Sequence, residues 1–247
     1  MNLSRRRFRI SLNLDDTVVY AIGDVHGCLD QLLQLEKLVF DDIDYPYHKK
    51  LIVMLGDYID RGPKSAHVIE HLMKPLPAGY KRICLLGNHE DAMLDFVDGY
   101  LSYDQWQHFG ANETLLSYGL DLQYLQMICK DKKKLSRMIV DLIPSSHVKF
   151  LHSLPIVAAS TKIVFVHAGI RPGVSLGKQK TRDLLYIRED FFNSTSKLRH
   201  LIVHGHTPVQ NVQLPAINRI NLDTQAYRTG RLSAVRLFKN EQLLLHT

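Results

Sequence analysis

Residues 17–27 read TVVYAIGDVHG, a short apolar run that stops at a glycine and is followed by an aspartate and a histidine. Two similar stretches come next: residues 51–62 read LIVMLGDYIDRG, and residues 82–90 read RICLLGNHE. A continuous apolar run that ends at a glycine is typical of a buried strand that opens into a loop. We therefore predict three buried strands, each followed by a polar loop.

Helical patterns separate these strands. Apolar residues recur at helical spacing over Leu29–Phe40 and again over Ser65–Met73. Strands that alternate with helices indicate βαβ units, and hence the α/β class. Two more apolar strands are expected at Lys162–Val166 and Leu201–Val203. The C-terminal runs, residues 219–222 and 232–238, are expected to form a closing pair of strands.

The middle of the chain has a different character. Residues 90–144 hold long amphipathic stretches with no strand pattern, and the lysine run at 132–134 is typical of a solvated helix face. We expect a single domain over residues 1–247, with a helical insertion at about 91–150. The aromatic residues of this insertion either line a rim that contacts substrate or form the insertion's own core; they are Tyr100, Tyr103, Trp106, Tyr118 and Tyr124.

Composition limits the class of protein. Of the 247 residues, 45% are hydrophobic and 23% are charged, which excludes a disordered or fibrous chain. The three cysteines are far apart and form no disulfide or zinc pattern, which favours a cytoplasmic location. The net charge of +6 suits an anionic ligand.

No apolar stretch is long enough to span a membrane, so no membrane partner is expected. The start of the chain, residues 4–7 (SRRR), looks like a twin-arginine export signal, but the apolar region that such a signal needs does not follow. We interpret it as a short basic lead.

Polar clusters follow five of the predicted strands. They are Gly23–Gly27, Gly56–Gly62, Gly87–Glu90, Val166–Gly169 and His204–Pro208. In open α/β sheets, ligands bind beyond the carboxyl ends of the strands, so these clusters are expected to meet at one edge. One such cluster alone is more often a turn, but five together indicate a site.

The residue types in these clusters suit metal ions. Carboxylate, imidazole and amide oxygen are ligands for Mn²⁺, iron and Zn²⁺, and no thiolate takes part. Two metals about 3.5–4 Å apart would clamp a phosphoryl group and generate hydroxide from bound water. One carboxylate has to bridge two such ions, and Asp57, in the middle cluster, is the natural candidate.

The motifs GDVHG, GDYIDRG and GNHE, followed by two later histidine motifs, resemble the calcineurin-like metallophosphoesterases of the phosphoprotein phosphatase type. The small bacterial and phage serine/threonine protein phosphatases are most similar. The resemblance spans about residues 18–235. It implies a four-layer αββα fold, in which a β-sandwich is flanked by helices.

The resemblance also implies roles for individual residues. Asp24 and His26 would bind the first metal, Asp57 would bridge, and Asn88, His167 and His206 would bind the second. The cofactors would be two divalent metal ions, Mn²⁺ with iron or Zn²⁺ as alternatives.

The catalytic residues implied by the resemblance surround these metals. His89 would act as general acid, oriented by Asp60, and Arg61 would grip the phosphate together with Asn88. In the segment LLYIR, residues 184–188, Arg188 is either a second phosphate clamp or a surface arginine.

Three positions depart from the family pattern or leave it open. Pro208 stands where many relatives carry a histidine, so the first metal would have only Asp24, His26 and Asp57 as protein ligands. His204 could face the same side as His206; we favour His206 as the ligand. Asp223 lies either beside the metals or in a turn, in a segment where Gln225 replaces a glycine.

We expect a metal-dependent phosphomonoesterase, specifically a protein phosphatase (Ser/Thr or Tyr) that uses a metal-activated hydroxide on phosphorylated protein or peptide. The alternative is a symmetrical dinucleoside tetraphosphate hydrolase; Asp60 argues against it. A nucleic-acid-binding module is disfavoured because the basic residues are dispersed, so no nucleic-acid partner is expected. A catalytically inactive scaffold is disfavoured because no ligand is missing.

Overall fold

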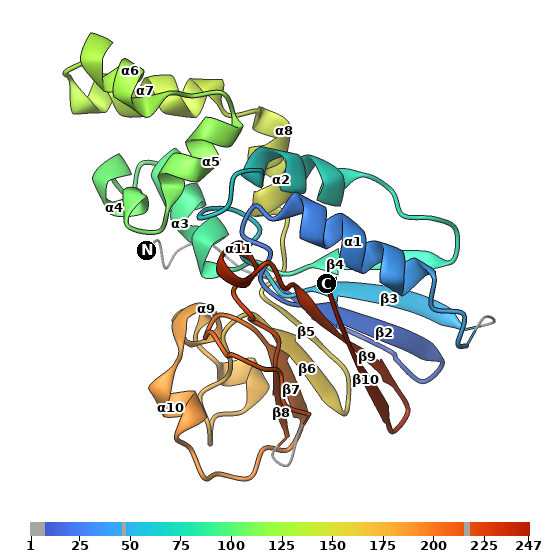
Figure 1. The fold of residues 1–247 in the computed structure, drawn as a ribbon. Coiled ribbons are helices and arrows are strands. Elements are labelled where there is room, and N and C mark those ends of the chain that lie inside the picture. The colour runs from blue at the N-terminus through green and yellow to red at the C-terminus, as the bar shows by residue number, and fades with distance from the viewer. Residues whose placement is uncertain (1–7, 46–47, 215–217) are drawn as a thin grey trace.

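The computed structural model describes residues 8–45, 48–214 and 218–247. The basic lead at residues 4–7 lies outside them. Two five-stranded sheets pack face to face (Figure 1). Helices α1 and α2 cover the outer side of one sheet, and α9 and α10 lie beside the other, which confirms the α/β class and the four-layer sandwich.

The first sheet carries three of the predicted strands. Its order is β10 (Glu241–His246), β9 (Ser233–Phe238), β2 (Thr17–Ile22), β3 (Lys49–Met54) and β4 (Tyr80–Cys84). Strands β2, β3 and β4 run parallel, so the loops after them emerge at the same edge. The crossover helices are α1 (Leu29–Phe40) and α2 (Ser65–Met73), at the predicted bounds.

The second sheet carries the later motifs. Its order is β1 (Arg9–Ser11), β5 (Val157–Ala159), β6 (Ile163–Val166), β7 (Leu201–His204) and β8 (Arg219–Asn221). The predicted closing pair of strands is wrong: β8 pairs with β7 in this sheet, whereas β9 pairs with β2 and β10 in the other. The connection between them, residues 222–232 with a short helix at Ala226–Thr229, carries the chain from one sheet to the other.

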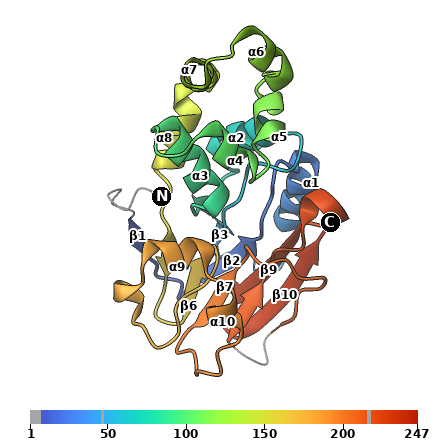
Figure 2. The same ribbon diagram turned by 90° about the vertical axis from the view of Figure 1, so that its left-hand side faces the viewer.

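Between β4 and β5 the described elements are all helices. They are α3 (Asn88–Val97), α4 (Tyr103–Gln107), α5 (Ala111–Ser117), α6 (Leu122–Ile128), α7 (Lys132–Leu142) and α8 (Ser145–His152). Figure 2 shows α6 and α7 at the far end of the molecule from the sheets. Short helices complete the fold: η1 (Leu176–Lys178), α9 (Thr181–Tyr186), α10 (Glu189–Phe192) and α11 (Ala226–Thr229).

The core between the sheets follows the alternation of side chains along each strand. In β2, Val19 and Ala21 face the other sheet, while Val18 and Tyr20 belong to the core under the helices. Because both faces of β2 are buried, its sequence is apolar without alternation, as expected for a parallel strand between two layers. Within the described ranges, no helix is long and apolar enough to cross a membrane.

Candidate metal centre

Loops after β2, β3, β4, β6 and β7 bring the predicted site residues together. Their side chains are almost wholly buried, between 0% and 6% exposed; they are Asp24, His26, Asp57, Asn88, His89, His167 and His206. Asp57 joins the first two loops, because its carbonyl accepts hydrogen bonds from the backbone N–H groups of Val25 (3.0 Å) and His26 (2.8 Å).

The backbone of these loops is unusual. His26, Asp57, Asp60, Arg61 and His206 all have left-handed φ angles, between 44° and 68°. Such angles cost about 1–3 kcal/mol each in residues other than glycine and persist where the surroundings enforce them. Their concentration in residues predicted to form one site indicates that the loops are shaped for function.

Asp57 belongs to two groups of side chains that could each hold a metal ion. One group is His26, Asp57 and His89, and the other is Asp57, His167 and His206; within each group the ligand atoms lie within 4.8 Å of one another. His26 Nε2 is 3.6 Å from Asp57 Oδ2, and His167 Nε2 is 3.4 Å from Asp57 Oδ1. The geometry therefore places Asp57 where a bridging ligand would stand.

The protonation of two of these histidines fits metal binding. His26 Nδ1 lies 2.8 Å from the Ile59 carbonyl, and His167 Nδ1 lies 3.0 Å from the Leu55 carbonyl. A carbonyl only accepts, so Nδ1 carries the proton, and a neutral ring then presents the lone pair of Nε2 to Asp57. Burial lowers the pKa of His26 to about 3 and also lowers that of His167, which keeps both rings neutral.

The second group also contains an amide. His167 Nε2 is 2.9 Å from Asn88 Oδ1, and the rings of His167 and His206 are 5.0 Å apart. Burial lowers the pKa of His206 as well. Two neutral imidazoles, an amide oxygen and a carboxylate form a donor set suited to a divalent transition metal.

Asp24 lies outside both groups, but one of its two carboxyl oxygens is left without a partner. Oδ2 accepts a hydrogen bond from the His206 N–H at 2.9 Å, whereas the buried Oδ1 has no hydrogen-bond partner. Burial, together with the nearby Asp223 and Asp57, raises the pKa of Asp24 well above its ordinary value. A buried polar atom normally has a partner, so an unpartnered oxygen among buried carboxylates is suited to bind a metal ion.

Glu90 holds the Asp57 loop in place. Its two carboxylate oxygens accept hydrogen bonds from the backbone N–H groups of Asp57 (2.9 Å), Tyr58 (2.7 Å), Ile59 (3.2 Å) and Gly87 (3.0 Å). Glu90 is fully buried, and burial raises its pKa to about 8. The sequence alone did not indicate this role, although Glu90 ends the GNHE motif.

His89 and Asp60 form a pair at the side of the metal groups. His89 Nδ1 lies 2.8 Å from Asp60 Oδ2. Burial works against a charged ring, but Asp57 and Asp60 outweigh it, so the pKa of His89 is raised above its ordinary value. An imidazolium held by a carboxylate is what the predicted general acid requires.

Both predicted arginines lie next to site histidines and are exposed. Arg61 Nη2 is 3.2 Å from His89 Nε2, and Arg188 Nε donates to His206 Nε2 at 3.1 Å. Arg61 Nη1 also donates to the Tyr227 hydroxyl at 3.0 Å, a contact that the sequence analysis missed. The structure thus places Arg188 at the site, where it is available to an anionic ligand.

Two further residues occupy positions that the sequence left open. The His204 ring lies between Phe191 and Phe192, with centroid distances of 5.2 and 5.5 Å, and belongs to neither metal-binding group. Asp223 is both a turn residue and a neighbour of the site: its Oδ1 accepts from the Gln225 N–H at 2.9 Å, and its charge raises the pKa of Asp24.

The aromatic residues of the helical segment divide between core and surface. Tyr103 and Trp106 are buried, 4% and 0% exposed, and Trp106 stacks on Phe96 at 5.0 Å. Tyr118 is partly buried against the core, whereas Tyr100 and Tyr124 are more than half exposed. For Tyr103 and Trp106, the interpretation as the segment's own core is confirmed.

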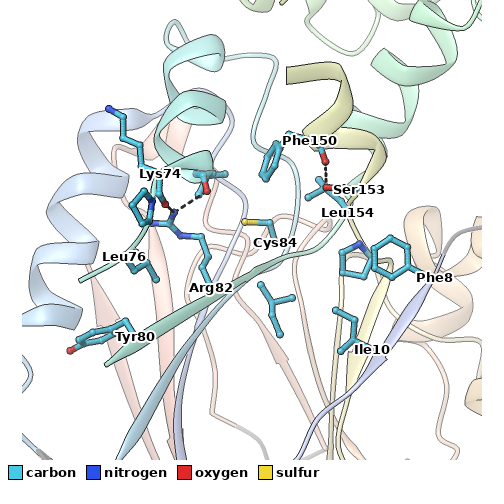
Figure 3. A pocket seen from close by; sticks show the side chains of 14 residues that line it. Phe8, Ile10, Lys74, Leu76, Tyr80, Arg82, Cys84, Phe150, Ser153 and Leu154 are labelled. Atoms are coloured by element: carbon cyan, nitrogen blue, oxygen red, sulfur yellow. Dashed lines mark hydrogen bonds between the residues drawn. The ribbon is translucent and has the colours of Figure 1, made fainter. Parts of the chain in front are cut away.

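A cavity of about 420 Å³ lies elsewhere, between the edge strands β4 and β1 (Figure 3). Arg82 lines this cavity, but its side chain already donates to Glu36 and to the carbonyls of His71 and Leu72. The cavity holds none of the predicted site residues. It is therefore a gap at the sheet edges rather than a competing site.

Residues 17–241 match the model of a family described as calcineurin-like phosphoesterase. The chain is also similar to the asymmetrical bis(5'-nucleosyl)-tetraphosphatase PrpE of Anoxybacillus flavithermus, with 30% identity over 87% of this chain and 88% of that protein. The protein of the same name from Bacillus subtilis is 27% identical over 87% and 88%.

Solved structures share the fold at low identity. The crystal structure of a protein provisionally assigned as a diadenosine tetraphosphatase has a TM-score of 0.65 and 20% identity, with 98% of each chain covered. A cold-active protein-tyrosine phosphatase from a psychrophilic Shewanella has a TM-score of 0.55 and 17% identity, over 96% of this chain and 83% of that one. These likenesses support the architecture only.

The predicted substrate class is wrong. The motifs predict a protein phosphatase acting on phosphorylated protein or peptide, yet the curated relatives that match most of the chain are named as bis(5'-nucleosyl)-tetraphosphatases. The physical reason for the error is that the metal motifs act on the phosphoryl group common to both substrates. They contain no information about what is attached to it.

Proposed function

This chain belongs to the calcineurin-like phosphoesterase family, and from that premise we propose that it hydrolyses dinucleoside tetraphosphates. The observation that carries the substrate class is the 30% identity, over 87% of the chain, to an asymmetrical bis(5'-nucleosyl)-tetraphosphatase. We further propose unequal cleavage, which would split a four-phosphate chain into a nucleoside triphosphate and a nucleoside monophosphate. This differs from the symmetrical alternative raised by the sequence.

We propose that two divalent metal ions bind here. Asp24, His26 and Asp57 would hold one, and Asp57, Asn88, His167 and His206 would hold the other. The unpartnered Asp24 oxygen supports the first assignment, and the neutral imidazoles support both. Bound in such a site, divalent ions polarise phosphoryl oxygens and activate water. Mn²⁺ suits the mixed nitrogen and oxygen donors, and iron and Zn²⁺ are the alternatives.

The exposed arginines are suited to the polyphosphate. Arg61 and Arg188 each place a guanidinium beside a buried histidine, and a planar guanidinium binds two phosphate oxygens at once. A phosphate between Arg61 and His89 would also offset the repulsion between these two positive groups, which otherwise works against protonation of His89. The net charge of +6 would attract a tetraphosphate from solution.

His89 would protonate the leaving group. Water would lose one proton to solvent, and the resulting hydroxide oxygen would bond to phosphorus. The bond from phosphorus to the bridging oxygen would break, and the proton on His89 Nε2 would move to that oxygen. Asp60, which faces the other ring nitrogen at 2.8 Å, would stabilise the imidazolium before the transfer. The leaving phosphate has a final pKa of about 6, so protonation assists the reaction without being essential.

We make two further proposals, on domain organisation and on cellular location. We propose that residues 91–150 are a helical insertion in a single domain. A cytoplasmic location is supported by the three cysteines, Cys28, Cys84 and Cys129, which are all free thiols.

The test is a product analysis. Metal-stripped protein would be reloaded with Mn²⁺, Fe²⁺ or Zn²⁺ and incubated with diadenosine tetraphosphate, and the nucleotides would be separated by ion-exchange chromatography. We expect AMP and ATP in equal amounts, and none without metal. ADP as the only product would contradict the unequal cleavage, and no hydrolysis with any of the three metals would contradict the substrate class.

A further inference from the structure

The helical segment after β4 holds the carboxylate of Asp60. Thr114, in α5, donates its hydroxyl proton to Asp60 Oδ1 at 2.6 Å, and Trp106, in α4, donates its indole N–H to Oδ2 at 3.3 Å. Oδ2 also faces His89 Nδ1 at 2.8 Å. All of these side chains are buried, with Asp60, Trp106 and Thr114 at 0% exposure. Both oxygens of Asp60 are therefore bound, and its carboxylate plane is set by the helical segment.

Thr114 also holds the backbone of Asp60. Its hydroxyl oxygen accepts a hydrogen bond from the Asp60 N–H at 2.8 Å, and the same N–H lies 3.1 Å from Ser65 Oγ. Asp60 has a φ of 66°, a conformation that its surroundings must enforce. One hydroxyl thus binds both the backbone and the side chain of the residue that faces His89.

We propose that Thr114 and Trp106 are positioning residues for the acid–base pair of His89 and Asp60, so that the helical segment completes the catalytic centre. This inference rests on the proposed role of His89 in leaving-group protonation. The torsion that orients a carboxylate is soft, so hydrogen bonds to its oxygens are needed to fix its plane. A small displacement of Asp60 would turn the His89 ring away from the leaving oxygen. Neither residue belongs to a motif that the sequence analysis used.

If Thr114 and Trp106 had a purely structural role, their loss would affect turnover differently. Trp106 stacks on Phe96 in the core, and Thr114 is completely buried, so loss of either could simply weaken packing. Weaker packing lowers stability and slows turnover on every substrate by the same factor. A positioning role slows turnover most where the leaving group needs a proton most.

The test uses substituted phenyl phosphates whose leaving groups span a range of acidity, with Mn²⁺-loaded protein. Thr114→Val keeps the shape and removes the hydroxyl, Thr114→Ser keeps the hydroxyl, and Trp106→Phe keeps a ring on Phe96. We expect Thr114→Val to lower kcat about tenfold on the least acidic leaving group and much less on p-nitrophenyl phosphate, with KM unchanged. Thr114→Ser should retain most of the wild-type kcat on both.

A double-mutant cycle completes the test. In a His89→Asn background, Thr114→Val should have no further effect on kcat, because the acid that it positions is gone. An equal loss on all leaving groups, or the same loss with and without His89, would overturn the proposal. If Thr114→Val does not fold, as judged by circular dichroism, Trp106→Phe is tested in the same double-mutant cycle with His89→Asn.

These substrates contain no nucleoside, so the outcome is independent of the substrate class. Failure to cleave diadenosine tetraphosphate would overturn the proposed function and leave this test intact. Conversely, normal cleavage of the tetraphosphate with a uniform loss in Thr114→Val would overturn only the positioning role.

Discussion

The backbone N–H of His206 donates to Asp24 Oδ2 at 2.9 Å, although the two residues are 182 positions apart in the chain. Asp24 follows β2 in one sheet, and His206 follows β7 in the other. This hydrogen bond therefore joins the two halves of the sandwich at the candidate metal centre. It also requires close approach, because a Cβ atom on Gly205 would meet Asp24 Oδ1 at 1.9 Å.

The close contact between Gly205 and Asp24 gives the first prediction. Gly205→Ala should push the Asp24 carboxylate away from the His206 loop, which would lower both metal content and turnover by at least about tenfold. Metal would be measured by inductively coupled plasma mass spectrometry after dialysis. Gly177→Ala is the control, because nothing lies within 4 Å of a Cβ atom there. Equal metal content in the two variants would contradict the assignment of Asp24 as a ligand.

Asp57→Asn should abolish metal binding at both positions. The Asp57 carboxylate faces His26 on one side and His167 on the other, at 3.6 and 3.4 Å. An amide has similar shape but no charge to hold two cations together. We expect less than one metal per chain and a loss of turnover of about a thousandfold or more. Asp30→Asn, at an exposed ion pair with Lys64, should change neither quantity.

His89→Asn should remove the acid without removing metal. Turnover on a phenyl phosphate with a weakly acidic leaving group should fall about a hundredfold or more, and less on diadenosine tetraphosphate, whose leaving phosphate needs less protonation. Parallel loss of bound metal would instead make His89 a ligand, as its place beside Asp57 and His26 would allow.

The pH dependence tests the environment of His89. Asp57 and Asp60 raise the pKa of His89 above its ordinary value of about 6.5, so the ring keeps its proton to a higher pH than a free imidazole does. A general acid works in its protonated form, so kcat should decline as pH rises through the raised pKa of His89. Asp60→Asn removes one cause of the raised pKa and should move that decline to lower pH. A kcat profile with the same alkaline limb in both proteins would contradict the pairing.

Glu36 is expected to matter for stability alone. Buried at 3% exposure, it lies 2.6 Å from His71 Nε2 and accepts from Arg82 Nη2 at 2.7 Å. Burial acts to raise its pKa, but His71 and Arg82 outweigh burial and lower it. Glu36→Gln should therefore reduce the free energy of unfolding by about 3 kcal/mol, since it leaves the Arg82 charge buried without its partner. Turnover should not change.

The sign of the pH effect on Glu36 follows from its lowered pKa. The stability that its charge contributes is present above the unfolded pKa of about 4.3 and is lost as pH falls through the lower folded value. Urea unfolding at neutral and acidic pH should show the wild type losing more stability in acid than Glu36→Gln. Equal losses would show that the Glu36 charge contributes nothing.

Several features were predictable because they depend on local sequence. Apolar runs that stop at glycine located β2, β3 and β7 to within about two residues, and helical spacing located α1 and α2 at their observed bounds. Parallel strands put their carboxyl ends at one edge, so the meeting of Asp24, Asp57 and Asn88 followed from the strand order alone. These inferences needed only periodicity and the direction of strands.

Other features depend on contacts between distant segments. Strands β8 and β9 lie in different sheets because each pairs with a different neighbouring strand. A short apolar run does not indicate which strand it will pair with. The hydrogen bonds of Thr114 and Trp106 to Asp60 span 54 and 46 positions, and no local pattern distinguishes them from ordinary core residues.

The sequence by itself determined the fold class and the set of candidate metal ligands, because both follow from short patterns of apolar runs, glycines and polar side chains. Only the tertiary structure decided that Asp57 stands between two histidine groups, that Asp24 is left with an unpartnered oxygen, and that a helical segment holds Asp60. These relationships arise when two sheets and a helical segment pack together, and the energies that select that packing are sums over residues far apart in the chain.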